Sequence, residues 1–284
     1  MNPAKVLVTG AAGFLGRAVV RALAGRGHSV TAFTRGDGAV PEGADRHVRG
    51  DVRDAHRVAE AVGGVDAVCH LAALTGVRAS FAEPLEYWLT NVGGTVNVLA
   101  ALGGDGGRLV VASTAAGRDS SPYAATKWAA DRACADVAAA GGLGAVSLRA
   151  YNLAGPGDPD ERRLIPKILA VAAGRGEFVV NGDGSVIRDF VHVEDMADAV
   201  VLALDACAAG GWRGYDIGSG RRTSVLEVVR VVEDVTGRAV PVQHAPAVDE
   251  PAVLVADPTS ARRELGWRPA RSDVRRIVED AWRS

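Results

Sequence analysis

The feature that most constrains the fold is a glycine-rich turn between a strand-like run and a helix-like run near the N-terminus. Residues 6–16 read VLVTGAAGFLG, so Gly10, Gly13 and Gly16 follow an apolar stretch and open a helical pattern. Small residues here permit a tight turn, close approach of a pyrophosphate to backbone N–H groups, and close packing of helix on strand. A purely structural turn has the same letters, but the strand–turn–helix context favours dinucleotide binding.

Strand-like and helix-like stretches alternate through the first half of the chain. Apolar runs typical of strands cover residues 5–9, 30–34, 47–50, 67–72, 108–113 and 145–151. Helical patterns cover residues 14–24, 55–62, 84–102 and 123–140. This alternation predicts βαβ units, and hence a parallel sheet covered by helices on both faces. The expected fold class is α/β, with a Rossmann-type doubly wound parallel sheet.

The alternation becomes less regular after Asn152, where short strands and helices follow one another without a fixed order. We therefore expect residues 1–152 to form a nucleotide-binding domain, to which residues 186–218 return. Residues 153–284 are expected to form mainly a smaller α+β domain that binds the substrate.

Composition narrows the class of protein further. The 284 residues are 48% hydrophobic and carry a formal net charge of -2, which argues against a nucleic-acid partner. Cys69, Cys134 and Cys207 lack CxxC spacing, so they indicate reduced thiols and neither a disulfide framework nor a metal site. No apolar run approaches the roughly 20 residues that span a bilayer, and no signal-peptide pattern opens the chain. We expect a cytoplasmic protein with no membrane partner.

A tyrosine and a lysine lie four residues apart in SPYAATK, residues 121–127. If a helix begins near Tyr123, then Tyr123 and Lys127 share one face of it. Free tyrosine has a pKa of about 10, and a neighbouring ammonium together with a nicotinamide cation would lower it. Thr114, which ends the fifth predicted strand, would supply a hydroxyl in the crevice where such sheets bind ligands. An ordinary surface helix also fits, but the glycine-rich turn favours Thr114, Tyr123 and Lys127 as catalytic residues.

Motifs along nearly the whole chain resemble one family. They are VTGAAGFLG, HLAALTGV (70–77), PLEYWLTNVGGTVNVL (84–99), SPYAATK, LRAYNLAGP (148–156), GDGSVIRDFVHVEDMADA (182–199), YDIGSG (215–220) and RRELGWRP (262–269). In this order they resemble the extended short-chain dehydrogenases/reductases of the NAD-dependent epimerase/dehydratase type, most closely the UDP-galactose 4-epimerases. The resemblance implies an NAD(P)-dependent enzyme that oxidises a sugar carbinol, expected at C4, and returns the hydride to the other face of the ketone.

The resemblance also implies roles for individual residues. Tyr123 is expected as the acid/base, Lys127 as its tuner and a ribose ligand, and Thr114 as the hydroxyl partner. The cofactor site is expected to comprise Tyr123 and Lys127 together with Gly10, Gly13, Phe14, Leu15, Gly16, Thr34, Arg35, Asp51, Val52, Leu71, Ala72, Ala73 and Asn91. The substrate site is expected to comprise Thr114 together with Thr75, Asn152, Arg163 and Arg188.

Several of these roles have a competing structural reading. Asn91 is implied near the nicotinamide and Asp51 near the adenine, but Asp51 equally fits a cap of the next helix. Asn152 and Arg188 match residues that hold the substrate's diphosphate, which suits the planar fork of arginine. Arg188 alone would instead fit an ion pair with a nearby acid such as Asp189.

The chain departs from the family at several positions that are expected to contact the cofactor or the substrate. Thr34-Arg35 stands where the epimerases have an acid on the adenosine ribose, which favours NADP over NAD, although Arg35 also fits a solvated surface arginine. Only eight residues separate Thr114 from Tyr123, where the family carries a longer loop. Ala247 replaces a nucleotide-binding arginine, and Arg163 and Thr75 replace a usual Asn and Lys. We expect UDP-glucose and UDP-galactose to be poor substrates.

Three functions remain compatible with the residues. The first is a nucleotide-sugar epimerase, the second an NADP(H)-dependent sugar ketoreductase or dehydrogenase, and the third a non-catalytic NAD(P)-binding protein. The intact set Thr114, Tyr123 and Lys127 counts against the third. The resemblance further implies a homodimer formed through the helices at 84–102 and 123–140.

Overall fold

The alternating strands of residues 5–150, together with one strand from residues 211–217, form a seven-stranded parallel sheet in the computed structural model, which describes residues 3–36, 38–103, 106–118, 120–207 and 210–284. Its strands are β1 (Lys5–Thr9), β2 (Ser29–Thr34), β3 (Arg46–Arg49), β4 (Ala67–His70), β5 (Gly107–Thr114), β6 (Leu143–Ala150) and β11 (Gly211–Ile217). Their spatial order is β11-β6-β5-β4-β1-β2-β3. This arrangement confirms the predicted Rossmann-type fold.

The strand order reverses its direction between β1 and β4, the neighbours at the middle of the sheet. These two strands run parallel, and Thr9 at the end of β1 is in register with His70 at the end of β4. Open α/β sheets bind ligands outside the carboxyl ends of the strands at such a switch point. The fold therefore puts the glycine-rich turn, which follows Thr9, at the place where a ligand site is expected.

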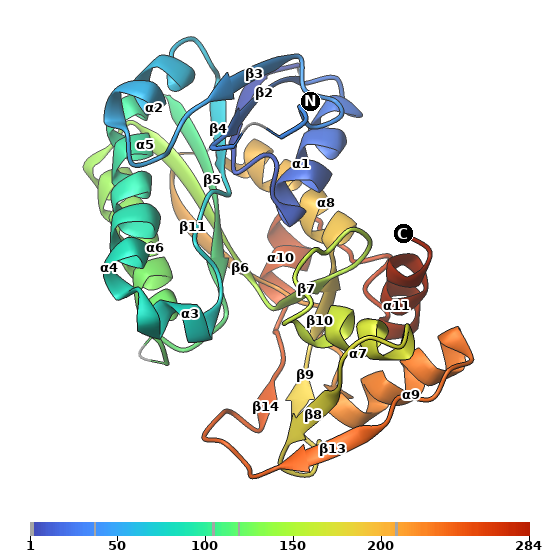
Figure 1. Ribbon diagram of the computed structural model, residues 1–284. Helices are drawn as coiled ribbons and strands as arrows, with labels where there is room; N and C mark the ends of the chain where they lie inside the picture. Colours follow the sequence, from blue (N-terminus) through green and yellow to red (C-terminus); the bar gives the residue numbers. More distant parts are fainter. Residues whose placement is uncertain (1–2, 37, 104–105, 119, 208–209) are drawn as a thin grey trace. The chain divides into compact units, whose positions relative to one another are not determined.

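Helices cover both faces of this sheet (Figure 1). The helices α1 (Phe14–Ala24) and α8 (Val193–Ala206) lie on one face, and α2 (Ala55–Val62), α5 (Gly94–Leu102) and α6 (Pro122–Ala140) lie on the other. On α1 the apolar side chains recur at helical spacing, so Val19, Val20 and Leu23 are all buried. A large hydrophobic core joins the sheet to α2, α5 and α6, with Leu7, Leu109 and Val98 among its fully buried members.

The segment expected as one helix over 84–102 is divided into three parts, and that expectation is corrected here. After α3 (Val77–Ala82), the chain forms α4 (Pro84–Tyr87), a π-helix η1 (Trp88–Gly93) and then α5. The wider turn of η1 lies where Asn91 turns its side chain inward to bond with Leu74. Short π-helical turns within helices occur frequently at functional sites.

The backbone contacts divide the chain into two units. The first unit contains Met1–Arg149, Ala197–Tyr215 and Arg263–Trp267, and the second contains Ala150–Met196, Asp216–Arg262 and Arg268–Ser284. No helix among the described residues is long and apolar enough to cross a membrane.

The second unit combines three small sheets with packed helices. Its strands are β7 (Asn152–Ala154), β8 (Phe178–Asn181), β9 (Ile187–Arg188), β10 (Phe190–His192), β12 (Thr223–Ser224), β13 (Val242–Ala245) and β14 (Val253–Leu254), and its helices include α7 (Leu164–Ala172), α9 (Val225–Thr236) and α11 (Val274–Trp282); α10 (Thr259–Glu264) ends where the chain returns to the first unit. The sheets pair as β10-β7, β12-β9-β14 and β13-β8. Side chains of α7, α9 and α11 bury a separate core that contains Ile168, Val228 and Ile277.

Candidate active site

The turn after β1 takes a form that glycine alone accommodates. Gly10 has a φ of +67°, and a Cβ placed on it would lie 2.7 Å from the backbone N of Ala72. A Cβ on Gly16 would collide with the carbonyl oxygen of Gly10. Gly13 closes the turn by donating its N–H to Gly10 O at 2.9 Å. The three glycines thus bring the backbone of the turn against both the end of β4 and the first turn of α1.

The N-terminus of α1 opens directly onto this turn. Its N-cap is Gly13, which has no side chain to bond the free N–H groups of the first helical turn. Phe14 and Leu15 begin the helix and are half-buried. The helix dipole and those N–H groups favour an anion at this end. The cradle of glycines and the uncapped helix end together fit the pyrophosphate of a dinucleotide.

The residues expected at the adenosine end lie close to the ends of β2 and β3. Thr34 is buried, and its hydroxyl lies 2.7 Å from His47 Nε2. Arg35 follows it on the surface, and we find no hydrogen bond or ion pair between Arg35 and another described residue. Ala72 and Ala73, after β4, are half-buried beside the glycine turn.

Asp51 does not cap the following helix, so that reading of the sequence is wrong. The N-cap of α2 is Asp54, whose carboxylate accepts from the N–H groups of His56 and Arg57. Asp51 instead forms a two-pronged ion pair with Arg53, at 3.0 and 2.8 Å, and this hydrogen bonding lowers the pKa of Asp51. Its neighbour Val52 is buried in the core of the first unit. The expected contact of Asp51 and Val52 with an adenine stays a prediction.

Tyr123 and Lys127 lie one turn apart at the start of α6. The N-cap Ser121 accepts the N–H of Ala124 at 3.1 Å, which begins the helix at the residue before Tyr123. The Tyr123 ring packs edge-on against Tyr87, with 6.4 Å between centroids and an interplanar angle of 83°. Lys127 is 9% exposed.

Thr114 ends β5 with its side chain buried. Its hydroxyl accepts the N–H of Ala116 at 3.2 Å, which turns the backbone sharply after the strand. The short segment from Thr114 to the helix therefore begins with a turn that holds the Thr114 side chain in place. Thr114 and the Tyr123–Lys127 pair all belong to the first unit.

Burial lowers the pKa of Lys127 to about 8, and the charge of Asp131 opposes that shift. Asp131 lies one further turn along α6, is 4% exposed, and accepts a short hydrogen bond from Ser147 Oγ. Its second oxygen lies 3.7 Å from Nε of Arg149. The guanidinium of Arg149 in turn lies over the ring of Trp128 at 5.1 Å. The Lys127 ammonium is therefore held near its titration point by desolvation, with a buried carboxylate as counter-charge.

Asn91 is buried, and its amide joins the segment after β4 to the helix α6. Its Oδ1 accepts the N–H of Leu74 at 2.8 Å, and its Nδ2 donates to Leu74 O and to Thr126 Oγ1 at 3.1 and 3.0 Å. His70, Thr95 and Thr126 join this network of hydrogen bonds although none was predicted from the sequence. The HLAALTGV motif contained His70, but a buried histidine with an unknown partner carries no specific signal.

Two of the expected substrate residues, Asn152 and Arg188, line a pocket of about 230 Å³ in the second unit. Asn152 donates through Nδ2 to Asp189 O at 3.0 Å. Arg188 is 14% exposed in its side chain and forms an ion pair with Glu250. The pocket is lined by these residues and by Arg162, Leu164, Lys167, Phe178, Val179, Val180, Asn181, Val186, Val225 and Glu250.

Arg188 does form an ion pair with an acid, but the acid is Glu250 and not Asp189. Asp189 is fully buried and accepts from the hydroxyl of Ser219 and from three backbone N–H groups, those of Ser219, Gly220 and Ala256. Glu250, 62 residues away in the sequence, takes its place beside Arg188.

The remaining substrate residues, Arg163 and Thr75, are not among the residues that line that pocket. Arg163 bonds Asp158 at 2.9 Å and also the carbonyl of Leu153, and its neighbour Arg162 lines the pocket instead. Thr75 is exposed in the first unit, where its carbonyl accepts from Tyr87 Oη at 2.7 Å. Their expected contacts with substrate stay predictions.

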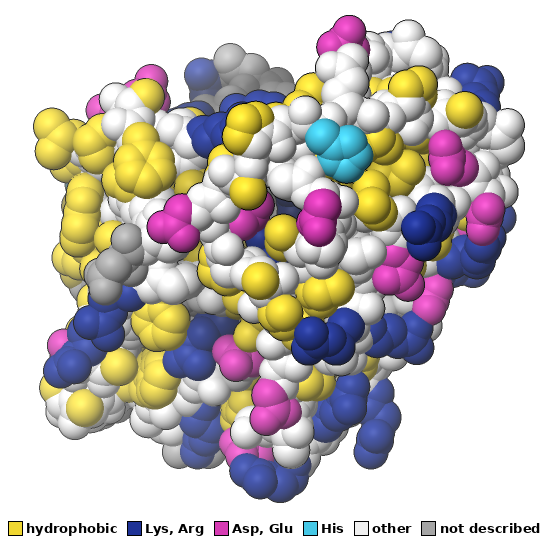
Figure 2. Space-filling view, turned by 90° about the horizontal axis from the view of Figure 1, so that it is seen from below, with side chains coloured by type: hydrophobic (Ala, Val, Ile, Leu, Met, Phe, Trp, Pro, Cys, Tyr) yellow, Lys and Arg dark blue, Asp and Glu magenta, His cyan; other side chains and the backbone are white. Residues whose placement is uncertain are grey.

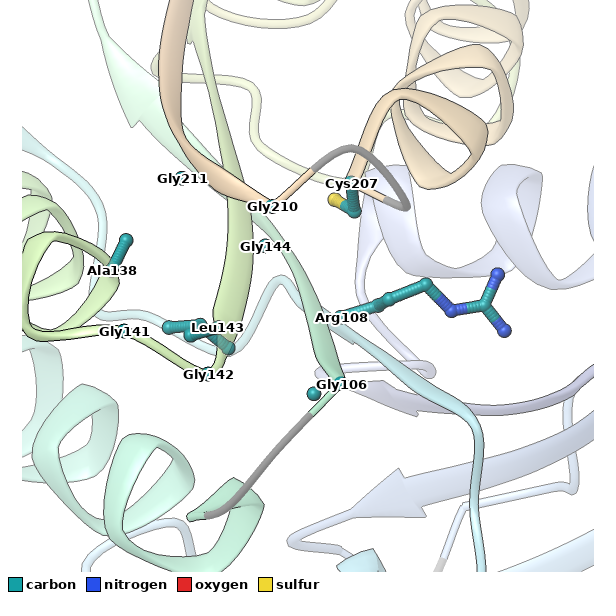
Figure 3. A pocket seen from close by; sticks show the side chains of 11 residues that line it. Gly106, Arg108, Ala138, Gly141, Gly142, Leu143, Gly144, Cys207, Gly210 and Gly211 are labelled. Atoms are coloured by element: carbon teal, nitrogen blue, oxygen red, sulfur yellow. The ribbon is translucent and has the colours of Figure 1, made fainter.

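A second cavity, of about 490 Å³, lies at the amino-terminal ends of β5 and β6, whereas Thr114 lies at the carboxyl end of β5. Figure 3 shows that glycines surround it where the chain enters β5, β6 and β11. Its one thiol, Cys207, donates to Leu109 O, and burial raises the pKa of Cys207 to about 12. A thiol held protonated in this way is a poor nucleophile, so Cys207 offers no reactive thiolate to this cavity.

The glycine cradle at the switch point and the tyrosine–lysine pair on α6 are typical of the short-chain dehydrogenase/reductase class. A family model described as the NAD dependent epimerase/dehydratase family matches residues 6–218. The chain belongs to this NAD-dependent epimerase/dehydratase family, which confirms the resemblance found in its motifs.

Individual relatives are similar over nearly their full length. A UDP-glucose 4-epimerase of Streptomyces lividans is 40% identical over 318 residues, covering 98% of this chain and 95% of that protein. One of Corynebacterium glutamicum is 39% identical over 312 residues, covering 98% and 94%. Both alignments exceed the 284 residues of this chain, so both relatives carry segments that it lacks.

A solved structure gives the same relationship in three dimensions. The UDP-glucose 4-epimerase from Stenotrophomonas maltophila, with bound NAD and formylated UDP-arabinopyranose, is 32% identical with a TM-score of 0.89. The match covers 99% of this chain and 97% of that chain.

The buried ammonium of Lys127 leads to a prediction about stability. The pKa of Lys127 is lower in the folded protein than the ordinary value near 10.5, so the folded state binds this proton more weakly than the unfolded state. The resulting cost is present below about pH 8 and fades as the pH rises toward 10.5. We expect Lys127→Met to melt at a higher temperature than the wild type at pH 7, with a smaller difference at pH 10.

Thermal unfolding of cofactor-free protein at both pH values measures this difference. Lys5→Met, which changes an exposed lysine, serves as the control and should show no such pH dependence. A Lys127→Met variant that melts below the wild type at pH 7 contradicts the expected cost of burial.

Proposed function

We propose that the protein is a nucleotide-sugar 4-epimerase, which inverts a sugar carbinol at C4 with no net oxidation or reduction. The observation that carries the proposal is the pair of half-buried Tyr123 and buried Lys127 on α6, in the same unit as the glycine cradle. Relatives named UDP-glucose 4-epimerase, up to 40% identical over 98% of the chain, support it.

Each catalytic side chain has a separate task in this reaction. Tyr123 takes the proton of the C4 hydroxyl as a phenolate and later returns it as a phenol, and the Lys127 ammonium stabilises the phenolate before the first transfer and after the second. The Thr114 hydroxyl bonds the reacting oxygen and orients it. NAD(P), when bound, supplies a hydride acceptor and donor, and the glycine cradle with the N-terminus of α1 would hold its pyrophosphate.

The pocket of the second unit supports a nucleotide diphosphate as the fixed part of the substrate. Arg162, Lys167 and Arg188 provide three cations, and Glu250 provides one carboxylate. Lys167 also lies over the Phe178 ring at 5.8 Å. A phosphate that binds Arg188 replaces Glu250 as its partner, and arginine can then bond two phosphate oxygens at once.

We further propose that plain UDP-glucose and UDP-galactose are poor substrates. The eight-residue segment between Thr114 and Tyr123 is shorter than in the family, which leaves fewer fixed contacts around the sugar. Ala247 lies beside Gly182 and offers no charge-assisted bond to a phosphate, worth about 1.5–3 kcal/mol. The formylated UDP-arabinopyranose bound by the solved relative supports a modified sugar as substrate.

A panel of sugar nucleotides tests the reaction and its substrate together. We expect epimerisation of at least one member with no net change in NAD(P)H absorbance, and with kcat/KM at least about 10-fold above that for UDP-glucose. Tyr123→Phe should lower kcat at least about 10²-fold with an unchanged Tm, because general acid–base groups contribute about 10²–10⁴.

The other outcomes identify the alternatives. Rapid interconversion of UDP-glucose and UDP-galactose contradicts the substrate proposal and leaves the reaction intact. Stoichiometric consumption of NADPH identifies a ketoreductase. Near wild-type turnover in Tyr123→Phe removes the catalytic assignment, and cofactor binding without turnover of any member indicates a binding protein.

We propose NADP(H) as the preferred cofactor. An acid at the end of β2 would bond both ribose hydroxyls and repel a 2′-phosphate, whereas this chain has the buried Thr34 followed by the exposed Arg35. Fluorescence titration should give tighter binding of NADPH than of NADH, and Arg35→Ala should weaken only NADPH, by about 10-fold. Arg21→Ala, at an exposed arginine in the last turn of α1, is the matched control. Tighter NADH binding by the wild type refutes the preference.

We also propose a homodimer with twofold symmetry. Hydrophobic side chains gather in Figure 2 along the side on which α4 and α6 lie in Figure 1. Phe81, Leu85, Trp88 and Leu89 are exposed there, Leu85 by 75% and Leu89 by 56%. Exposed apolar patches of this kind mark interaction sites.

Light scattering at micromolar concentration tests the dimer. We expect twice the monomer mass for the wild type and a monomer for the double variant Leu85→Lys/Leu89→Lys. Val179→Lys, at a valine that is 40% exposed in the second unit, should leave the dimer unchanged. A monomeric wild type refutes the proposal.

A further inference from the structure

A continuous line of buried hydrogen bonds begins at the carboxyl ends of β1 and β4. Thr9 Oγ1 lies 2.8 Å from His70 Nδ1, and the other ring nitrogen, Nε2, lies 3.1 Å from Thr95 Oγ1 on α5. The Thr95 hydroxyl donates to Asn91 O at 2.6 Å. His70 and Thr95 are 3% and 2% exposed, so these bonds exclude water.

The line continues from Asn91 to the catalytic helix. Asn91 Nδ2 donates to Thr126 Oγ1 at 3.0 Å, and the Thr126 hydroxyl donates to Tyr123 O at 2.8 Å. Asn91 is 1% exposed and Thr126 is completely buried. Side chains on β1, β4, α5, η1 and α6 thus connect the nucleotide turn with the backbone of Tyr123.

The donors and acceptors along this line fix the state of His70. Thr9 Oγ1 already accepts from the N–H groups of Leu71 and Ala72, each at 3.2 Å, so its own proton is directed to His70 Nδ1. Thr95 gives its proton to Asn91 O, and it therefore accepts from His70 Nε2–H. The neutral tautomer with the proton on Nε2 satisfies every member. Burial and the charge of Lys127 lower the pKa of His70 to about 3, which agrees with a neutral ring.

We propose that His70 is a positioning residue, which holds the nucleotide-binding turn and the catalytic helix at a fixed distance and orientation. One side of its ring bonds Thr9, whose hydroxyl holds the backbone of Leu71 and Ala72 beside Gly10. The other side bonds Thr95, which controls the carbonyl of Asn91 in the π-helix.

An apolar side chain at position 70 would fill the same space without the cost of burying an imidazole. A polar network in which every member is paired is instead rigid and has a single arrangement. Such rigidity serves hydride and proton transfer, because a displacement of about 1 Å between reacting groups can cost about 10²-fold in rate. The part of the inference that concerns turnover rests on the proposed function.

We call the buried line of hydrogen bonds through Thr9, His70, Thr95, Asn91 and Thr126 the relay. Thr95→Val tests the relay, because it removes the central hydroxyl and keeps the shape of the side chain. Thr90→Val is the matched control, since Thr90 is a buried threonine of η1 whose hydroxyl has no hydrogen-bond partner among the described residues. Thr95→Ser keeps the hydroxyl and should rescue function. All four proteins are compared at one temperature well below the lowest Tm.

Two readouts need no sugar substrate. Thr95→Val should weaken NADH binding about 3–10-fold and shift the fluorescence emission maximum of bound NADH, because the turn and Asn91 are no longer held together. Thr90→Val and Thr95→Ser should match the wild type in both. Wild-type affinity and emission in Thr95→Val, or equal effects in Thr90→Val, overturn the proposal.

Turnover supplies the third readout where the wild type is active. Thr95→Val should lower kcat about 10-fold and change KM by less than about 3-fold, since no relay member is expected to bind the sugar. A KM effect with unchanged kcat overturns the proposal. If the wild type epimerises no sugar nucleotide, the proposed function fails, while the NADH readouts still decide the role of the relay.

Discussion

The approach of Gly10 to the end of β4 is the contact on which the rest of the first unit depends. A Cβ on Gly10 would lie 2.7–2.9 Å from backbone atoms of Leu71 and Ala72, and the φ of +67° is itself unfavourable for other residues. Because this contact is possible, the turn packs closely against the middle of the sheet, and α1 begins with the N–H groups of its first turn facing the crevice. The same approach brings Thr9 within bonding distance of His70 and so starts the buried line of hydrogen bonds.

The helix α6 also buries polar groups at an energetic cost. It buries charged side chains at positions where an ordinary helix would bury apolar ones. Lys127 and Asp131 lie on the same face as the apolar Cys134 and Ala138. Isolated charges at such positions are strongly disfavoured, so each has compensation: Lys127 has Asp131, and Asp131 has Ser147 and Arg149. The apolar end of α6 stabilises the helix, and the polar end adjusts the acid–base group.

Hydrophobic periodicity was enough to predict the sheet, because strand and helix patterns record which side chains are buried. The expected helix at 14–24 coincides with α1, and the expected strand at 5–9 with β1. Periodicity does not distinguish an α-helix from a π-helical turn, since both bury one face, and the prediction for 84–102 failed for that reason. The same limit applies to Asp51, where Asp54, three residues later, has the geometry of the cap.

Partners that are distant in the sequence were beyond reach for a different reason. The relay joins residues from Thr9 to Thr126, and each bond depends on which strands are neighbours in the sheet. Arg188 likewise pairs with Glu250 because β9 and β14 lie side by side. Local reasoning selected Asp189, but alternation along the strand turns adjacent side chains to opposite faces. Asp189 consequently serves the interior, bonded to Ser219 and Ala256.

The two units therefore differ in how far their polar side chains are buried. In the first unit the polar side chains of the relay are buried and bonded to one another, so a substitution disturbs several elements at once. In the second unit the cations of the pocket are paired with partly exposed carboxylates, Arg188 with Glu250 and Arg162 with Asp160. Partly exposed pairs contribute little to stability, and a phosphate can replace either carboxylate. If the proposed function holds, substitutions such as Ala247 change the ligand of the second unit without loss of the fold, while the hydride and proton chemistry of the first unit is kept.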